Sequence, residues 1–336
     1  MKARLDNSPE VIALARQLGV ANGSPVQGLL AFSDQRVRSF IRKFKTCDTL
    51  VDLLDISAQQ CGTRFEIVNS SQALDALVAK YATRNEPIFA ILEREFMRGV
   101  LGITLRLQSP QPWELPFVSV IDMRGDRHRR AYFTKWHEIA HLLLLTDNGR
   151  SSFRRTHIAE DKRDAEEELM DLVAGQCGFH HAVIAPHTTQ RISFPEIERL
   201  RLQLCPDSSK QAARLGFTAA WPTPVILIEC KLKTRYADSS ERSVLRVVSL
   251  KMNPAAERVN LTIPHNISVP PRSVISHLFG HTGKSAEAIE NLGWWKTDHN
   301  EYLTSLPLRI SATARNGAID ALITPAEENV EHDQSL

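Results

Sequence analysis

The stretch YFTKWHEIAHLLLL, residues 132–145, decides how the first half of this chain folds. It is dominated by apolar residues and contains neither Gly nor Pro, so we expect a buried helix from Arg130 to Leu145. Within it, residues 137–141 have the form H-E-x-x-H. Positions i and i+4 of a helix lie one above the other on the same face. The helix therefore presents two imidazoles side by side.

These residue types suit a metal site. Neutral imidazole is a good ligand for Zn²⁺, so we expect His137 and His141 to bind one zinc ion. Glu138 stands beside the first ligand, where its carboxylate can act as the catalytic base on a water molecule that the metal activates. The alternative is a chance pentapeptide in a core helix. That arrangement would bury three polar side chains without a shared partner, at a cost of about 1–3 kcal/mol each.

A catalytic zinc site needs a third protein ligand. The segment EDKRDAEEELMDLVAG, residues 160–175, offers Glu166, Glu167 and Glu168 at the start of a helix predicted from Asp164 to Gly178. Periodicity alone leaves all three carboxylates open as the ligand. Without the upstream pentapeptide, the same cluster would indicate an exposed acidic helix start, which the helix dipole favours.

The composition indicates an ordinary globular protein. The 336 residues are 43% hydrophobic and 24% charged, with a net charge of +2. Chain length suggests about two domains, and the near-neutral charge argues against a strongly basic nucleic-acid binder. The five cysteines are odd in number and contain no CxxC pair, which indicates a reducing compartment. We find no signal-peptide pattern and no apolar run long enough to span a bilayer, so we expect a cytoplasmic protein without a membrane partner.

The rest of the pattern predicts a mixed α+β chain. An apolar stripe predicts a helix over Asp34 to Lys45, and alternation predicts strands over Val100 to Leu107 and Phe117 to Asp122. We interpret the last of these as an edge strand to which an extended substrate could add. Strand-like segments beyond residue 206 predict a second, β-rich domain.

The two site motifs together resemble the ImmA/IrrE family of zinc metallopeptidases. That family typically has Phe-Thr shortly before H-E-x-x-H and then a helix with E-x-x-A-(D/N)-x-F-A. Phe133 and Thr134 match the first feature, and Glu167, Asp171 and Ala174 match the second. The resemblance, which covers residues 48–190, selects Glu167 as the third zinc ligand. The chain departs from the family at Trp136, Met170 and Val173, and at residues 177–180, where the family's Leu-Leu-x-Pro ending is absent.

The resemblance implies a fold and a function. It implies a zincin-like metallopeptidase domain over 48–205, in which the active-site helix packs on a small β-sheet. N-terminal helices occupy 1–47, a mixed C-terminal domain that we compare with the GAF fold occupies 206–325, and a tail occupies 326–336. Family members commonly cleave a helix-turn-helix (XRE-like) repressor and so switch on stress, DNA-damage, mobile-element or phage-defence genes. We therefore expect a zinc-dependent endopeptidase with such a repressor as its substrate.

Several further residues are candidates for secondary roles. A donor that stabilises the oxyanion could be Tyr132, His157, His180 or His181. A cysteine thiolate from Cys177, Cys205 or Cys230 could occupy the open zinc position and inhibit the enzyme. Basic residues on both sides of the active-site helix could bind single-stranded DNA as an activator; they are Arg127, Arg129, Arg130, Arg154 and Arg155. Core packing and solvated surface are the simpler interpretations of all of these.

Two other functions compete with proteolysis. In the first, the zincin-like domain docks the repressor and displaces it from DNA without cutting; an intact Glu138 argues for the enzyme, because docking does not need it. In the second, the N-terminal helices form a helix-turn-helix that binds DNA. Gly19 and the Gly23-Ser24-Pro25 turn would then separate its helices.

Overall fold

The computed structural model describes residues 2–21, 23–44, 46–145, 152–156, 164–188, 191–234, 243–297 and 301–326. The fold is mixed α+β with two β-sheets, as expected. Two compact units are present: Met1–Ile184 with Leu200–Gly216, and Ala185–Arg199 with Phe217–Leu336. This division differs from the predicted segments, because residues 1–47 belong to the first unit and the chain enters the second unit twice.

The first unit contains a four-stranded sheet in the order β1-β3-β2-β4. Its strands are β1 (Thr63–Val68), β2 (Val100–Arg106), β3 (Phe117–Asp122) and β4 (Ser152–Thr156). β1 runs parallel to β3, whereas β2 is antiparallel to both of its neighbours. The prediction that Phe117–Asp122 is an edge strand is wrong, because β3 lies between β1 and β2. The outer strands are β1 and β4.

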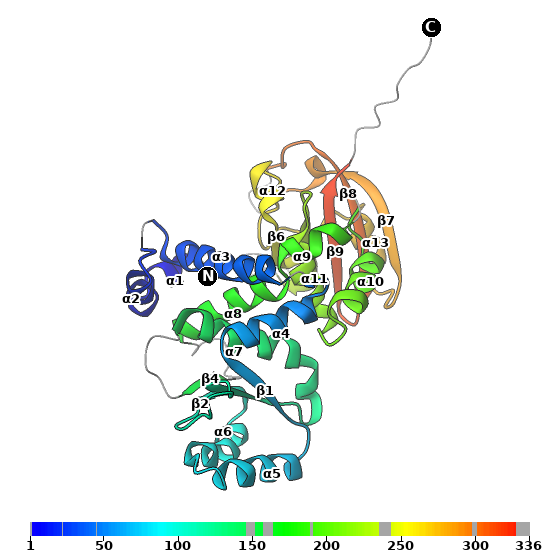
Figure 1. The fold of residues 1–336 in the computed structure, drawn as a ribbon. Coiled ribbons are helices and arrows are strands. Elements are labelled where there is room, and N and C mark those ends of the chain that lie inside the picture. The colour runs from blue at the N-terminus through cyan, green and yellow to red at the C-terminus, as the bar shows by residue number, and fades with distance from the viewer. Residues whose placement is uncertain are drawn as a thin grey trace. The chain divides into compact units, whose positions relative to one another are not determined.

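Helices cover both faces of this sheet (Figure 1). One face carries apolar side chains such as Ile103, Leu105, Val118 and Val120. It is covered by α5 (Ser71–Ala82), η1 (Pro87–Ile91) and α6 (Leu92–Met97). The opposite face packs against α7 (Ala131–Leu145). The helix predicted from the H-E-x-x-H stretch therefore lies directly on the sheet.

Four helices precede the sheet: α1 (Lys2–Asp6), α2 (Pro9–Gln17), α3 (Pro25–Lys43) and α4 (Leu50–Gln60). α3 begins nine residues before the predicted Asp34, because Ser24 caps its N-terminus and Pro25 fits the first turn. A capping box between Thr49 and Asp52 starts α4.

α3 is hydrogen-bonded to both helices that carry the site. Arg36 donates to the carbonyl oxygen of Leu143 on α7 at 2.6 Å. The carbonyl oxygen of Leu30 accepts from Gln176 at 3.1 Å, and Gln176 lies on α8 (Ala165–Gly178). α3 therefore fixes α7 and α8 relative to each other. Helices α9 (His181–Ile184), α10 (Phe194–Leu204) and α11 (Lys210–Ala220) follow.

The second unit is built on an antiparallel sheet of order β6-β5-β9-β8-β7. Its strands are β5 (Ile226–Thr234), β6 (Ser243–Met252), β7 (Ser285–Asn291), β8 (Pro307–Arg315) and β9 (Ala318–Pro325). The short helices α12 (Pro254–Arg258) and α13 (Val274–Leu278) complete it. Trp295 is fully buried and packs in the core of this unit.

Within the described ranges, no helix combines the length and the apolar character that a membrane span requires.

Candidate metal centre

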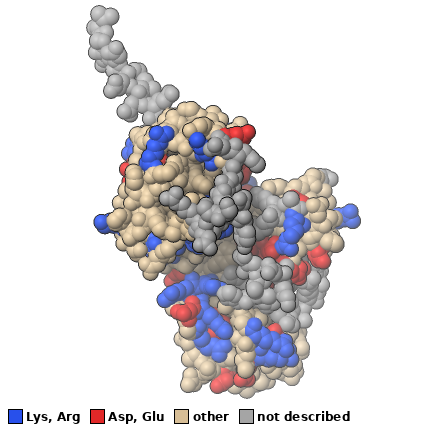
Figure 2. All heavy atoms as spheres, turned by 180° about the vertical axis from the view of Figure 1, so that it is seen from behind, with Lys and Arg blue, Asp and Glu red and all other residues tan. Residues whose placement is uncertain are grey.

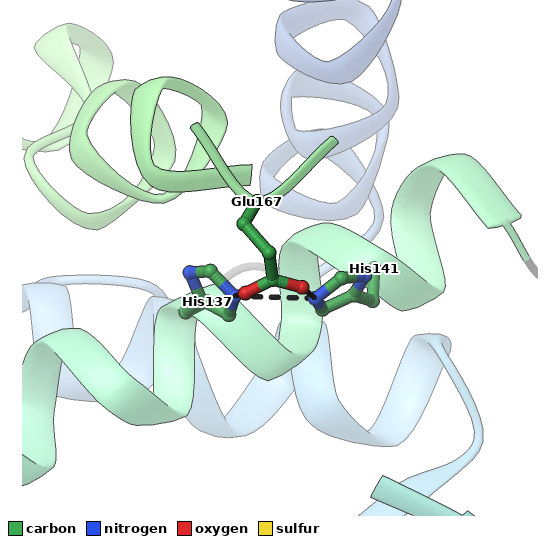
Figure 3. Close-up of side chains that lie close together, drawn as sticks. All are labelled: His137, His141 and Glu167. Atoms are coloured by element: carbon green, nitrogen blue, oxygen red, sulfur yellow. Dashed lines mark hydrogen bonds and ion pairs between the residues drawn. The ribbon is translucent and has the colours of Figure 1, made fainter. Parts of the chain in front are cut away.

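Two helices bring three ligand-type side chains together. His137 and His141 stand one turn apart on α7, and Glu167 reaches between them from the first turn of α8 (Figure 3). The Nε2 atoms of the two histidines are 3.1 Å apart. Oε2 of Glu167 lies 3.2 Å from Nε2 of His137, and Oε1 lies 3.4 Å from Nε2 of His141. Periodicity leaves Glu166, Glu167 and Glu168 open and the family resemblance selects Glu167, which is the one that the structure brings to the histidines.

The spacing of these atoms fits a tetrahedral ion. Zn²⁺ binds imidazole nitrogen and carboxylate oxygen at about 2.0–2.2 Å, so two of its tetrahedral ligands lie about 3.4 Å apart. The distance between the two Nε2 atoms, 3.1 Å, and the distance from each of them to its nearer Glu167 oxygen, 3.2 and 3.4 Å, are close to that value. Both histidines are buried, and the side chain of Glu167 is 22% exposed. The residues present therefore fit a zinc ion with two imidazoles and one carboxylate.

Asp171 determines which nitrogen of His137 faces the other ligands. Its Oδ1 lies 2.9 Å from Nδ1 of His137, and a carboxylate oxygen can only accept at neutral pH. The proton is therefore on Nδ1, and the lone pair of Nε2 points toward His141 and Glu167. Lone pairs that converge in this way repel one another unless a cation lies between them. Metal-binding histidines in proteins commonly donate their second nitrogen to a carboxylate in the same manner.

Glu167 is strongly acidic in this environment. Burial opposes ionisation of its carboxyl group, but the neighbouring imidazoles of His137 and His141 outweigh that effect and lower its pKa to about 2. Glu168, by contrast, forms an ion pair with Arg4 of α1. The two neighbouring carboxylates therefore have different partners: Glu168 pairs with Arg4, and Glu167 contacts the two histidines.

Glu138 lies on the sheet side of α7 and is fully buried. Its Oε2 accepts a hydrogen bond of 2.8 Å from the hydroxyl of Thr104 on β2. Among the described residues, its Oε1 has no hydrogen-bond partner. Burial raises the pKa of Glu138, although the nearby imidazoles and the Thr104 hydroxyl act in the opposite direction. A carboxylate with a raised pKa and one unpartnered oxygen is suited to accept a proton.

Sequence reasoning missed Thr104 because its partner is distant in the chain. The one available signal is the alternation of β2, which places Gly102 and Thr104 on the face opposite Ile103 and Leu105. A Cβ atom at residue 102 would lie 2.8 Å from Oε1 of Glu138. Glycine at this position leaves the space that the carboxylate occupies.

Trp136 and Gly178 fit each other where α7 meets α8. Trp136 is buried beside Gly178 at the end of α8. A Cβ atom at residue 178 would lie 3.0 Å from the indole of Trp136. The large residue on α7 thus fits because α8 has no side chain where the two helices meet.

The candidate oxyanion donors have other partners or lie outside the described residues. Tyr132 is buried, and its hydroxyl donates to the carbonyl oxygen of Gly178 at 2.5 Å. His180 pairs with Asp34 at 3.1 Å, and His181 is exposed. His157, the remaining candidate, lies outside the described residues. The structure therefore brings none of the described candidates into the group of His137, His141 and Glu167.

The three cysteines considered as inhibitors are buried, and none of them belongs to the group of His137, His141 and Glu167. Burial raises the pKa of Cys177, Cys205 and Cys230, that of Cys205 to about 11. Cys205 accepts from the hydroxyl of Ser208 at 3.3 Å, and Cys230 lies in the core of the second unit. All five cysteines are free thiols. A thiol with a raised pKa is a poor metal ligand, because zinc binds the thiolate.

Part of the basic run before α7 is engaged in structural contacts. Arg124 and Arg127 both pair with the buried carboxylate of Asp122, and Arg127 also donates to the carbonyl oxygen of Phe96. Arg129 lies 3.8 Å from Asp126, its partner within η2 (Gly125–Arg130). Arg154 and Arg155 belong to β4, of which the structure describes the backbone only. On the face drawn in Figure 2, Lys and Arg lie in separate groups with Asp and Glu among them.

Comparison with known proteins adds little to this description. No protein-family model matches the chain, and no curated protein matches it. A solved structure of a Mycobacterium tuberculosis transcriptional regulator is similar at 11% sequence identity and a TM-score of 0.40, over 94% of this chain and 81% of that chain. A likeness this distant assigns no function, so the functional argument rests on the metal centre itself.

Proposed function

We propose that this protein is a zinc-dependent endopeptidase that cleaves a helix-turn-helix repressor. The observation that carries the proposal is the convergence of His137, His141 and Glu167 beside the buried carboxylate of Glu138. A docking surface requires neither a ligand set with tetrahedral spacing nor a buried base next to it. The repressor as substrate, and the zincin-like assignment of the first unit, rest on the resemblance to the ImmA/IrrE family.

The roles of the residues follow from their positions. Zinc, when bound, lowers the pKa of water and polarises the scissile carbonyl. His137, His141 and Glu167 would hold the ion, and Asp171 keeps His137 in the tautomer that leaves Nε2 unprotonated. Glu138 would accept the proton of the attacking water and deliver it to the leaving amine.

The corrected sheet order changes where a substrate would bind. β3 is an interior strand, so an extended peptide cannot add to it. β4 is an outer strand that packs on α7 and pairs, among the described residues, with β2 alone. An extended substrate segment that adds to β4 would lie beside the helix that carries His137 and His141.

A sensory role for the second unit is part of this proposal and rests on the resemblance to larger family members that have a separate C-terminal domain. Counted in chain order from β5, the strands of this unit follow the order 2-1-5-4-3, with the first and last strands adjacent at the centre. In the proposed function, this unit receives the activating signal, and single-stranded DNA is the first signal to test.

The test is direct. Purified zinc-loaded protein is incubated with the helix-turn-helix protein encoded beside its gene, with and without single-stranded DNA, and the products are read by mass. The matched control is Glu138→Gln, which keeps the shape of the side chain and removes its basicity. Specific fragments that disappear with the variant support the peptidase. If the repressor stays intact yet binds this protein and leaves its operator, the non-proteolytic function is correct.

A further inference from the structure

A line of buried hydroxyl groups crosses the sheet of the first unit and ends at Glu138. Thr63 on β1 lies 2.9 Å from Ser119 on β3, and Ser119 lies 2.7 Å from Thr104 on β2. Thr104 in turn donates to Oε2 of Glu138 at 2.8 Å. All three hydroxyl-bearing residues are buried. The line therefore connects three strands to the proposed base.

Strand register places these residues on one face. Thr104 and Ser119 are directly opposite each other in the β2–β3 ladder, and Phe65 rather than Thr63 is opposite Ser119 in β1. Thr63 therefore meets Ser119 as a diagonal neighbour. Ile103, Leu105, Val118 and Val120 lie in the apolar core on the opposite face of the same strands. The buried hydroxyls of Thr63, Thr104 and Ser119 therefore share the face that α7 covers.

The hydrogen bonds of the line have one direction. A hydroxyl group has a single proton, and that of Thr104 is donated to the Glu138 carboxylate. The oxygen of Thr104 must then accept from Ser119, and the oxygen of Ser119 must accept from Thr63. The hydroxyls of Thr63 and Ser119 therefore help to orient the Thr104 hydroxyl so that its proton points toward the Glu138 carboxylate.

The space around the second oxygen of the Glu138 carboxylate, Oε1, is limited as well. A Cβ atom at Gly102 would lie 2.8 Å from Oε1 and 2.7 Å from Cγ2 of Thr134. β2 therefore contacts Glu138 through two residues of one face: Thr104 binds one oxygen, and Gly102 leaves room for the other. Asp122 forms ion pairs with two arginines, whereas the Glu138 carboxylate accepts a hydrogen bond from a neutral hydroxyl.

We propose that Thr104, supported by Ser119 and Thr63, is a positioning residue that orients the carboxylate of Glu138 for proton transfer. The proposal rests on the proposed peptidase function and adds to it a residue that orients the general base, Glu138. A misplacement of about 1 Å in a catalytic group can reduce the rate by about a hundredfold, so a fixed donor on a rigid strand has a measurable effect.

The first experiment compares variants of the zinc-loaded protein on the repressor. Thr104→Val removes the hydroxyl with little change of shape, and Thr104→Ser retains it. The matched control is Thr218→Val, which removes another fully buried hydroxyl that, among the described residues, has no hydrogen-bond partner. Each variant is measured for kcat, KM and zinc content.

For Thr104→Val we expect kcat to fall by about tenfold to a hundredfold while KM and zinc content stay within about twofold. Thr104→Ser should restore most of kcat, and Thr218→Val should leave it unchanged. If Thr104→Val keeps wild-type kcat, or if serine does not restore it, Thr104 has only a packing role. Should Thr104→Val not fold, Ser119→Ala decides: a smaller loss of kcat supports the proposal, and an unchanged kcat overturns it.

A second readout does not depend on catalysis. Crystal structures of zinc-loaded Thr104→Val and Thr104→Ser show where the Glu138 carboxylate lies. We expect it to move in the valine variant and to keep its position in the serine variant; an unmoved carboxylate in both contradicts the proposal. If the wild-type protein cleaves no repressor, the peptidase function fails, and these structures still decide whether Thr104 positions Glu138.

Discussion

Nδ1 of His137 lies 2.9 Å from Oδ1 of Asp171, which stands one helical turn beyond Glu167 on α8. In the proposed zinc site, α8 would thus supply one ligand, Glu167, and the carboxylate that supports another, His137. Loss of such a supporting carboxylate typically weakens metal binding by about 10–100-fold. We expect that loss for Asp171→Ala and a smaller one for Asp171→Asn, whose amide oxygen still accepts from Nδ1–H. Competition with a chelator of known zinc affinity measures both.

The choice among the three acidic residues of α8 can be tested by zinc stoichiometry. Glu167→Gln removes the anionic ligand between the two imidazoles, so we expect a larger loss of zinc affinity than for Asp171→Ala. Glu166→Gln is the matched control, because it changes the neighbouring carboxylate and should keep zinc. Equal retention of zinc by both variants would exclude Glu167 as a ligand.

Gly102 should tolerate no side chain. Gly102→Ala places a methyl group within contact distance of Thr134 and Glu138, and overpacking of this kind costs about 1–3 kcal/mol of unfolding free energy. Gly175→Ala, in the interior of α8, is the control, because the nearest atom to its Cβ is 4.0 Å away. That change should stabilise the protein by about 0.5–1 kcal/mol. Urea denaturation of both variants measures the difference, and a stable Gly102→Ala would show that this contact is looser than described.

The buried pair of His180 and Asp34 predicts a pH dependence of stability. Nδ1 of His180 accepts from the backbone N–H of Ala182, so the neutral ring carries its proton on Nε2, which faces Asp34. Burial lowers the pKa of His180, and this outweighs the opposing effect of Asp34. The unfolded state therefore binds a proton, below its pKa of about 6.5, that the folded state does not bind. Stability is present in full above that pH and is lost as the pH falls.

One such proton contributes at most about 1.4 kcal/mol per pH unit. We expect His180→Gln to flatten the dependence of unfolding free energy on pH between about 7 and 5.5, a window set by the unfolded-state pKa. His181→Gln, at the adjacent exposed position, should leave the slope as it is in the wild type. A slope that is the same in all three proteins would assign the pH dependence to other groups.

Local signals predicted the elements of the first unit well. β3 has the predicted bounds and β2 ends one residue before the predicted Leu107, because alternation and flanking turns are properties of short segments. The helix predicted from Asp164 begins one residue later, because Asp164 caps it. The H-E-x-x-H spacing likewise predicted the pairing of His137 and His141, because a helix alone brings those positions together.

Features that depend on distant segments could not be predicted. The sequence of Phe117–Asp122 does not show which strands pair with it. Both β1 and β2 do, so the prediction of an edge strand is wrong. The short apolar run at residues 87–97 has no capping motif, and it forms η1 and α6. Thr63, Thr104 and Ser119 meet only once three strands are in register. For Glu167, periodicity leaves three choices; the family resemblance selects one, and the packing of α8 on α7 brings that residue to the histidines.

The hydrogen bonds from α3 to Leu143 and Gln176 bear on how this centre can be exchanged between proteins. His137 and His141 lie on α7 and Glu167 lies on α8, and α3 is hydrogen-bonded to both helices. A chimera that carried only residues 48–205 would contain every proposed ligand but would lack α3. Recombination or design that moves this centre to a new host must therefore carry α3 with it.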